Sequence, residues 1–278
     1  MSLEAIKDLP EGYYGVEIMG IHNRALTKEE IMENYKKYMN IPKLVSLIPA
    51  RAGSSRISNK NIKMIAGKPL IAWTIEASLK SKYIDRTIVS TEDKQIKAIA
   101  LEYGAEVIDR PKQYATDNGK WEINGIVQHF KDTLTQQDYH PDYMAFLHVT
   151  SPLRTAKHID EAFEQMIEKN QLLTASFTPF YHLPHTHLKA IDDKGITRDV
   201  WEYQYTNPID KGLPKLYYFN GAIMIGYYPM FNYYSFTRLP VLGYVMKQED
   251  GIDVDTMFDF KVAEMMLREK INRKEVKK

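Results

Sequence analysis

The sequence predicts an α/β protein built on a mostly parallel β-sheet. Short apolar runs typical of buried strands alternate with segments in which apolar residues recur at helical spacing. Such alternation produces right-handed β-α-β units and a sheet that helices cover on both faces. The chain has 278 residues, of which 44% are hydrophobic and 26% charged, so it can fill a globular core.

The predicted elements follow one another in chain order. Each strand is an apolar run, and each helix has apolar residues three and four positions apart. Thr91, Glu92 and Asp93 offer capping oxygens to one helix, which Gly104 ends. The predicted strands are 44–49, 86–91, 105–108, 144–149, 173–177, 222–226 and 239–246. The predicted helices are about 69–79, 96–103, 123–134, 159–167 and 262–267.

Two segments depart from this alternation. Residues 1–42 form an N-terminal appendage of unassigned role, in which Thr27 and Glu30 begin a helix as a capping box. Residues 178–219 are rich in histidine, proline and aromatic residues, so we interpret them as an inserted arm. The main domain is then predicted to span 43–278.

Charge and composition exclude several classes of protein. There are 37 basic and 36 acidic residues, whereas general nucleic-acid binders carry a basic excess. No cysteine is present, so disulfides and thiol catalysis are excluded. No apolar run approaches the ~20 residues that cross a bilayer, and the first residues lack the apolar core of a secretory signal. We therefore expect a soluble, cytoplasmic protein that binds neither nucleic acid nor membrane.

The loop after the first strand carries the most chemistry. In parallel sheets, ligands bind beyond the carboxyl ends of the strands. This loop, IPARAGSSRISNKNI, combines small residues that expose backbone N–H groups with three cations and no acid, which suits several phosphates. It lacks the Walker A and G-x-G-x-x-G spacings, and it is also compatible with a solvated basic loop. The residues concerned are Arg51, Gly53, Ser54, Arg56 and Lys60.

A pair of aspartates precedes the last helix, in GIDVDT at 251–256. Asp253 and Asp255 are two positions apart, so in extended chain both side chains point the same way. Two such carboxylates suit Mg²⁺, which completes its shell with phosphate oxygens and water. The triplet is equally compatible with a helix-capping turn, and the phosphate-type loop in the same chain favours the metal.

Three further segments give weaker signals. HVTSPLR at 148–154 follows a strand and offers hydroxyl groups and an arginine, or is simply a proline turn. NGA at 220–222 fits a tight turn or the close approach of a ligand. A histidine cluster has the spacing H-x-x-H-x-H, which matches no common zinc site, so it either lines a pocket or packs. Its members are His182, His185 and His187.

Six segments, in the same order, resemble the cytidylyltransferases that activate 2-keto-3-deoxy sugar acids. These are the N-acylneuraminate enzymes and their relatives for pseudaminic, legionaminic and octulosonic acids. The similarity runs from about Leu44 to Leu267. The segments are IPARAGSSRISNKNI, GKPLIAWTIEASL, DRTIVSTEDKQIKAIALEYGAEVIDRP, TSPLRTAKHIDEA, NGAIMI and IDVDTMFDFKVAE.

The resemblance implies a Rossmann-like nucleotidyltransferase fold with a dimerisation arm at 178–219, and therefore a homodimer. It also implies transfer of CMP from CTP to the anomeric hydroxyl of a sugar acid, with Mg²⁺ and release of pyrophosphate. The implied catalytic residues are Arg51, Lys60 and Asp255, and the implied metal ligands are Asp253 and Asp255. Either Asp255 or a metal-bound hydroxide is implied to take the proton of the anomeric hydroxyl. The implied CTP-binding residues are Arg51, Gly53, Ser54, Arg56, Lys60, Asn61 and Arg110, and the implied sugar-binding residues are His148, Ser151, Lys215 and Asn220.

The sugar side departs from the family pattern. Ser55 stands where sialic acid enzymes carry a lysine, and His148 replaces a glutamine that faces the sugar. The arginines that grip the sialate carboxylate are missing before Asn220. Lys211 or Lys215 would have to substitute, although lysine lacks a bidentate fork. The nucleotide chemistry therefore transfers further than the identity of the sugar acid.

Two other functions are compatible with the motifs. A metal-dependent glycosyltransferase also uses a D-x-D motif, although there the triplet follows a mid-domain strand, whereas here it comes late. A nucleotide-binding module without catalysis, acting through its appendage, is the second alternative. The altered sugar side favours that module, and the intact Arg51, Lys60, Asp253 and Asp255 argue against it.

Overall fold

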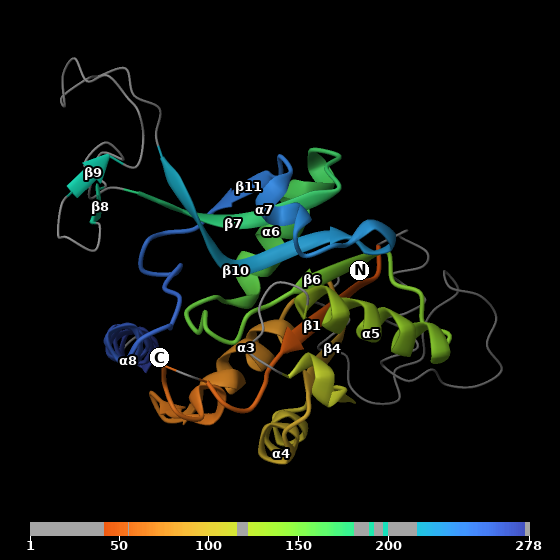
Figure 1. The fold of residues 1–278 in the computed structure, drawn as a ribbon, viewed down its shortest axis with the longest axis horizontal. Coiled ribbons are helices and arrows are strands. Elements are labelled where there is room, and N and C mark those ends of the chain that lie inside the picture. The colour runs from red at the N-terminus through yellow and green to blue at the C-terminus, as the bar shows by residue number, and fades with distance from the viewer. Residues whose placement is uncertain are drawn as a thin grey trace.

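Helices cover both faces of a seven-stranded sheet in the computed structural model (Figure 1). Residues 1–41 of the predicted appendage lie outside the described residues. The predicted arm is described only at its two ends and at two short strands. The structure describes residues 42–54, 56–115, 122–180, 189–191, 197–199 and 216–275.

The sheet has the strand order β11-β7-β10-β6-β1-β4-β5. Every neighbouring pair is parallel except the two pairs that β10 makes with β6 and β7, so the predicted mostly parallel sheet is confirmed. Six strands thus end at one edge, the carboxyl edge, and β10 begins there. The strands are β1 (Leu44–Pro49), β4 (Ile84–Thr91), β5 (Glu106–Asp109), β6 (Tyr143–Phe146), β7 (Leu173–Pro179), β10 (Tyr217–Tyr227) and β11 (Leu242–Val245).

Two small antiparallel sheets accompany the main one. The first pairs β2 with β3, directly before α3 (Leu70–Leu79), and the second pairs β8 with β9. These strands are β2 (Met64–Ile65), β3 (Lys68–Pro69), β8 (Lys189–Ile191) and β9 (Thr197–Asp199).

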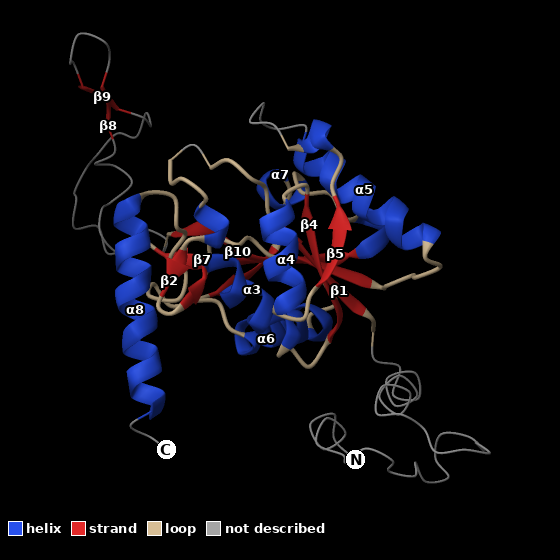
Figure 2. Ribbon diagram, turned by 90° about the horizontal axis from the view of Figure 1, so that it is seen from below, coloured by secondary structure: helices blue, strands red, loops and turns tan. Residues whose placement is uncertain are grey.

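The helices form two layers around the main sheet. Helices α3, α4, α6 and α8 contribute to the apolar core on one face, and α5 and α7 contribute to the core on the other. Figure 2 shows α8 and α5 well apart on the two sides of the sheet. The remaining helices are α4 (Lys94–Glu102), α5 (Glu122–Gln136), α6 (Ala156–Glu168), α7 (Ser235–Arg238) and α8 (Met257–Glu275), with short 3₁₀ turns η2 (Lys60–Ile62), η3 (Lys112–Tyr114) and η5 (Tyr228–Met230).

Local capping explains where α4 and α6 begin. The Asp93 carboxylate accepts hydrogen bonds from the backbone N–H groups of Gln95 and Ile96, as predicted. Glu92 does not take part in this cap, because its carboxylate reaches back to the loop after β1. At the start of α6, Thr155 forms a capping box with His158.

The strands at the centre of the sheet end differently from the prediction. β6 stops at Phe146 rather than at residue 149, so His148 lies in a loop. β10 begins at Tyr217, five residues before the predicted start, because Tyr217 and Pro179 extend the pairing of β10 with β7. Between Phe219 and Met224 the register shifts, and Gly221 adopts a left-handed φ of 68° within this bulge.

Candidate active site

The buried ion pair between Glu92 and Arg110 holds the loop after β1 in place. The Glu92 carboxylate accepts from the backbone N–H of Ala52 at 2.7 Å and from Arg110 Nε at 3.0 Å. Arg110 also donates to the carbonyl of Ala50 at 2.5 Å, and its side chain is only 2% exposed. The pair therefore ties together the ends of β1, β4 and β5. Arg110 thus supports the loop, and its implied contact with CTP stays a prediction.

The loop above this ion pair is shaped by its own side chains. Arg51 donates to the carbonyl of Gly53 at 3.0 Å, and Asn61 donates to the carbonyl of Arg51 at 3.0 Å. Gly53 is exposed with a left-handed φ of 69°. Ser54 is partly exposed beside it. Asn61 thus fixes the backbone that carries Arg51.

The D-x-D segment contacts this loop through side chains of Lys60 and Arg56. Lys60 Nζ donates to the carbonyl of Val254 at 2.8 Å and to Asp255 Oδ1 at 3.2 Å, although 195 residues separate Lys60 from Asp255. Arg56 lies 2.7 Å from the second carboxylate oxygen of Asp255. Burial acts to raise the pKa of Asp255, but the hydrogen bonds from Arg56 and Lys60 outweigh it, and the pKa falls below its usual value.

Asp253 has the opposite electrostatic behaviour. Burial raises its pKa, the negative charge of Asp255 adds to the rise, and a hydrogen bond from Thr150 opposes it. The intervening Val254 donates its N–H to the carbonyl of Thr150 at 2.7 Å, which fixes the segment against the loop after β6. Two neighbouring carboxylates that repel each other in this way fit a hard cation such as Mg²⁺. Among the described residues there is no group of three His, Cys, Asp or Glu that would hold a metal, so phosphate oxygens and water would complete the shell.

His148 and Tyr233 form a second group at the carboxyl edge. His148 Nε2 lies 3.3 Å from the Tyr233 hydroxyl, and the His148 carbonyl accepts from Arg154 at 3.1 Å. Burial and the positive charges of Arg154 and Lys60 lower the pKa of His148 to about 4, so the ring is neutral at pH 7. Sequence reasoning missed Tyr233, because the tyrosine-rich stretch around it resembles ordinary packing.

Two residues predicted to bind the sugar are buried. Asn220 Oδ1 accepts from the Ser176 hydroxyl at 2.5 Å and from the backbone N–H of Ala222 at 3.0 Å. Asn220 Nδ2 donates to the Thr178 hydroxyl at 2.9 Å. Its side chain therefore holds the β10 bulge, and a direct sugar contact would break these bonds. Ser151 is 1% exposed, which also separates its hydroxyl from a substrate.

Several predicted residues lie outside the described residues, so the structure does not place them. They are Ser55, His182, His185, His187, Lys211 and Lys215.

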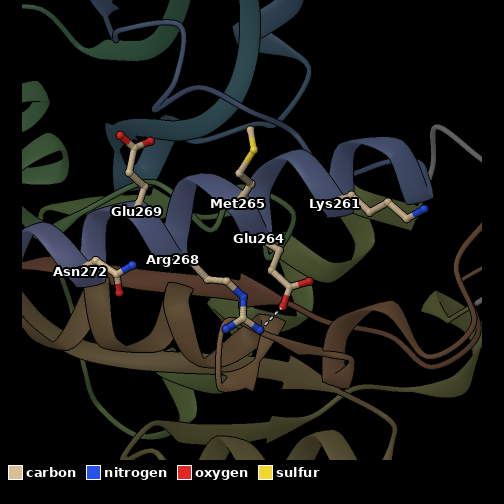
Figure 3. A pocket seen from close by; sticks show the side chains of 6 residues that line it. All are labelled: Lys261, Glu264, Met265, Arg268, Glu269 and Asn272. Carbon is tan, nitrogen blue, oxygen red and sulfur yellow. Dashed lines mark hydrogen bonds and ion pairs between the residues drawn. The ribbon is translucent and has the colours of Figure 1, made fainter.

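A surface hollow of about 530 Å³ lies on α8 (Figure 3). Its described lining comes from one helix, and Arg268 pairs with Glu264 within that helix at 2.7 Å. No side chains from different loops converge there, so we place the candidate active site at the carboxyl edge. The lining residues are Lys261, Glu264, Met265, Arg268, Glu269 and Asn272. No helix in the described part of the chain is long and apolar enough to span a bilayer.

The strand order and the two helix layers define an α/β protein with a Rossmann-like nucleotidyltransferase fold. A CMP-2-keto-3-deoxy-manno-octonic acid synthetase solved with CTP has the same fold, with a TM-score of 0.59 over 82% of this chain and 99% of that chain, at 16% identity. A 4-diphosphocytidyl-2C-methyl-D-erythritol synthase from Anaerococcus prevotii has a TM-score of 0.51 over 82% and 99% of the two chains, at 14% identity.

Sequence comparison gives the family. Residues 45–210 match the cytidylyltransferase family model, and the chain belongs to this family. It is 34% identical to the Escherichia coli O18:K1:H7 N-acylneuraminate cytidylyltransferase, over 84% of this chain and 54% of that protein. It is 33% identical to the Legionella pneumophila CMP-N,N'-diacetyllegionaminic acid synthase, over 81% and 96% of the two chains. The chain spans about half the length of the N-acylneuraminate cytidylyltransferases that it matches.

Removing Glu92 should destabilise the protein strongly. Glu92→Ala leaves the Arg110 charge buried without its carboxylate, so we expect the free energy of unfolding to fall by about 3–5 kcal/mol. Urea denaturation measures this. Glu106→Ala is the matched control. It breaks the ion pair between Arg86 and the half-exposed Glu106 carboxylate, and it should lower the free energy of unfolding by no more than about 1 kcal/mol. Equal losses in the two variants would contradict the role assigned to Glu92.

The neutral state of His148 should make stability depend on pH. Below pH 6.5 the unfolded chain protonates this histidine, whereas the folded protein does so only near pH 4. The free energy of unfolding therefore falls as the pH is lowered from 6.5 to 4, by at most ~3 kcal/mol from this residue. Urea unfolding at several pH values gives the dependence of the free energy of unfolding on pH. In His148→Gln this dependence should be weaker than in the wild type, by the equivalent of about one bound proton. An unchanged slope would show that His148 titrates normally.

Proposed function

We propose that the protein transfers CMP from CTP to the anomeric hydroxyl of a 2-keto-3-deoxy sugar acid and releases pyrophosphate. The observation that carries this proposal is the junction of Lys60 and Arg56 with Asp255, which brings a phosphate-type loop to a carboxylate pair. Membership of the cytidylyltransferase family supports CTP as the nucleotide. Relatives named for N-acylneuraminate, legionaminic acid and pseudaminic acid support a sugar acid of this class as the acceptor.

The loop after β1 would receive the triphosphate. Gly53 and Ser54 offer backbone N–H groups, and Arg51, Arg56 and Lys60 carry the charges that phosphate oxygens need. Lys60 is suited to act on the transferred group, because its side chain is held to 11% exposure beside Asp255. A cation fixed in place before the reaction stabilises developing negative charge without reorganisation.

Asp253 and Asp255 would hold Mg²⁺, which supplies charge neutralisation at the phosphates when it is bound. In the reaction the anomeric oxygen attacks the α-phosphorus, the bond from that phosphorus to the bridging oxygen breaks, and pyrophosphate leaves in line. The anomeric hydroxyl loses its proton, and we assign Asp255 to receive it. The lowered pKa of Asp255 keeps this carboxylate ionised at neutral pH, as a metal ligand must be, but it also makes Asp255 a weaker base.

A pyrophosphate assay tests the proposal directly. The protein is mixed with CTP, Mg²⁺ and a panel of eight- and nine-carbon 2-keto-3-deoxy sugar acids. We expect CTP-dependent release of pyrophosphate with at least one acid and none without an acid. Binding of CTP by calorimetry without release for any acid would overturn the proposal and favour the nucleotide-binding module. Release of UDP from a UDP-sugar donor would instead indicate the glycosyltransferase.

Lys60 and Asp255 should be needed for the chemical step. We expect Lys60→Ala and Asp255→Ala to lower kcat by at least ~10²-fold while the protein stays folded, since removing one preorganised group typically costs ~10²–10³-fold. Steady-state pyrophosphate release measures the loss. Lys97→Ala is the control, because Lys97 pairs with Asp109 on the surface at 2.7 Å. A site variant within about threefold of wild type would remove that residue from the mechanism.

We also propose that the protein is a homodimer. Tyr217 and Tyr218 are exposed at the start of β10, where the predicted arm rejoins the sheet. Exposed aromatic residues of this kind favour contact with a second subunit. Sedimentation at micromolar concentration should give the mass of two chains, and a monomer would contradict the proposal.

A further inference from the structure

Tyr233 reaches the candidate site from a part of the chain that the motifs do not include. It lies between η5 and α7, 85 residues after His148. Its hydroxyl is 3.3 Å from His148 Nε2, and the two rings stand perpendicular with centroids 6.0 Å apart. Neither residue is fully buried.

Packing fixes the position of the Tyr233 hydroxyl. The Tyr233 ring lies 5.2 Å from the ring of Phe146, the last residue of β6. The backbone N–H of Tyr233 donates to Asn124 Oδ1 at 3.2 Å, which ties the segment to α5. Phe231 and Phe236, on either side, are buried in the core. Contacts with β6 and α5 therefore hold Tyr233 in place, although it lies in the turn between η5 and α7.

His148 is held equally firmly. Its carbonyl oxygen accepts from Arg154 at 3.1 Å and from Thr74 at 3.4 Å. The His148 ring also packs edge-on against the ring of Phe146, with centroids 5.1 Å apart. The imidazole therefore has little freedom to turn away from Tyr233.

The pair is uncharged at neutral pH, unlike the loop after β1. Burial and nearby cations lower the pKa of His148 to about 4, and burial together with the Asp253 charge raises the pKa of Tyr233. His148 lies two residues before Thr150, whose carbonyl accepts the N–H of Val254 at 2.7 Å, so the pair adjoins the segment that carries the two aspartates. A neutral pair of hydrogen-bonding groups suits a hydroxyl or amide, whereas a carboxylate or phosphate needs a cation.

The shared hydrogen bond leaves Tyr233 able to contact a ligand. If the hydroxyl donates to His148 Nε2, the tyrosine oxygen still accepts. If His148 donates instead, the tyrosine proton is available to a ligand. The pair can thus match either a donor or an acceptor.

We propose that Tyr233 is a specificity-determining residue that, with His148, receives an uncharged hydroxyl or acylamino substituent of the sugar acid. This inference rests on the proposed function, because it requires a sugar acid at the carboxyl edge. Tyr233 and His148 would thus recognise an uncharged substituent of the sugar acid and not its carboxylate.

Tyr233→Phe tests the inference, because it removes the hydroxyl and keeps the ring. With an accepted sugar acid we expect KM for that acid to rise about tenfold, the usual effect of one hydrogen bond, while kcat and KM for CTP stay within about threefold. Acids that differ in one hydroxyl or acylamino group should lose discrimination in the variant. Tyr228→Phe is the matched control, since this nearby hydroxyl is buried without a hydrogen-bond partner among the described residues.

A double-mutant cycle adds a readout that a purely structural role would not produce. If the two residues act as one pair, His148→Leu combined with Tyr233→Phe should raise KM for the acid no more than the larger single change. An unchanged KM for every accepted acid in Tyr233→Phe would overturn the inference and leave the proposed function intact. A wild-type protein that binds CTP but uses no acid of the panel would overturn both.

Discussion

The ammonium group of Lys60 is the contact on which the rest of the site depends. It joins the first loop of the domain to the segment before its last helix, through the Val254 carbonyl and the Asp255 carboxylate. A lysine ammonium has three protons, and these bonds use two of them. The third would be left for a phosphate oxygen in the reaction proposed above. One side chain thus both closes the fold and serves the reaction proposed for it.

The same Lys60 contact affects the charge of both aspartates in the D-x-D segment. Asp255 is held ionised by Arg56 and Lys60, whereas Asp253 is destabilised as an anion by burial and by its neighbour. A dication at this position would relieve the repulsion, and triphosphate oxygens would compete for the two cations. Magnesium and nucleotide are therefore expected to support each other's binding. That coupling favours an enzyme for a magnesium-bound triphosphate over a module that binds the nucleotide alone.

The sequence was sufficient for elements that local patterns determine. Apolar runs and spacing located β1, β4, β5, β6 and β7, but not the two-residue strands β2 and β3, and Asp93 was found among the capping oxygens of α4. Contacts between distant residues were beyond such patterns. Nothing near Glu92 indicates that its carboxylate turns back to Arg110 and Ala52, and nothing near Tyr233 indicates His148 as its partner. These pairs depend on strand order, which sets which loops meet at the carboxyl edge.

The buried charge of Arg154 connects this strand order to the sugar side. Its guanidinium donates to the carbonyls of His148 and Ala222, and so joins the end of β6 to the bulge of β10. Burial lowers its pKa to about 9, yet the group stays charged at pH 7. That charge helps to keep His148 neutral. A carboxylate beside Arg154 would stabilise it but would also let His148 take up a proton more easily. Burying Arg154 without a carboxylate partner destabilises its charge, but it keeps the His148 imidazole neutral.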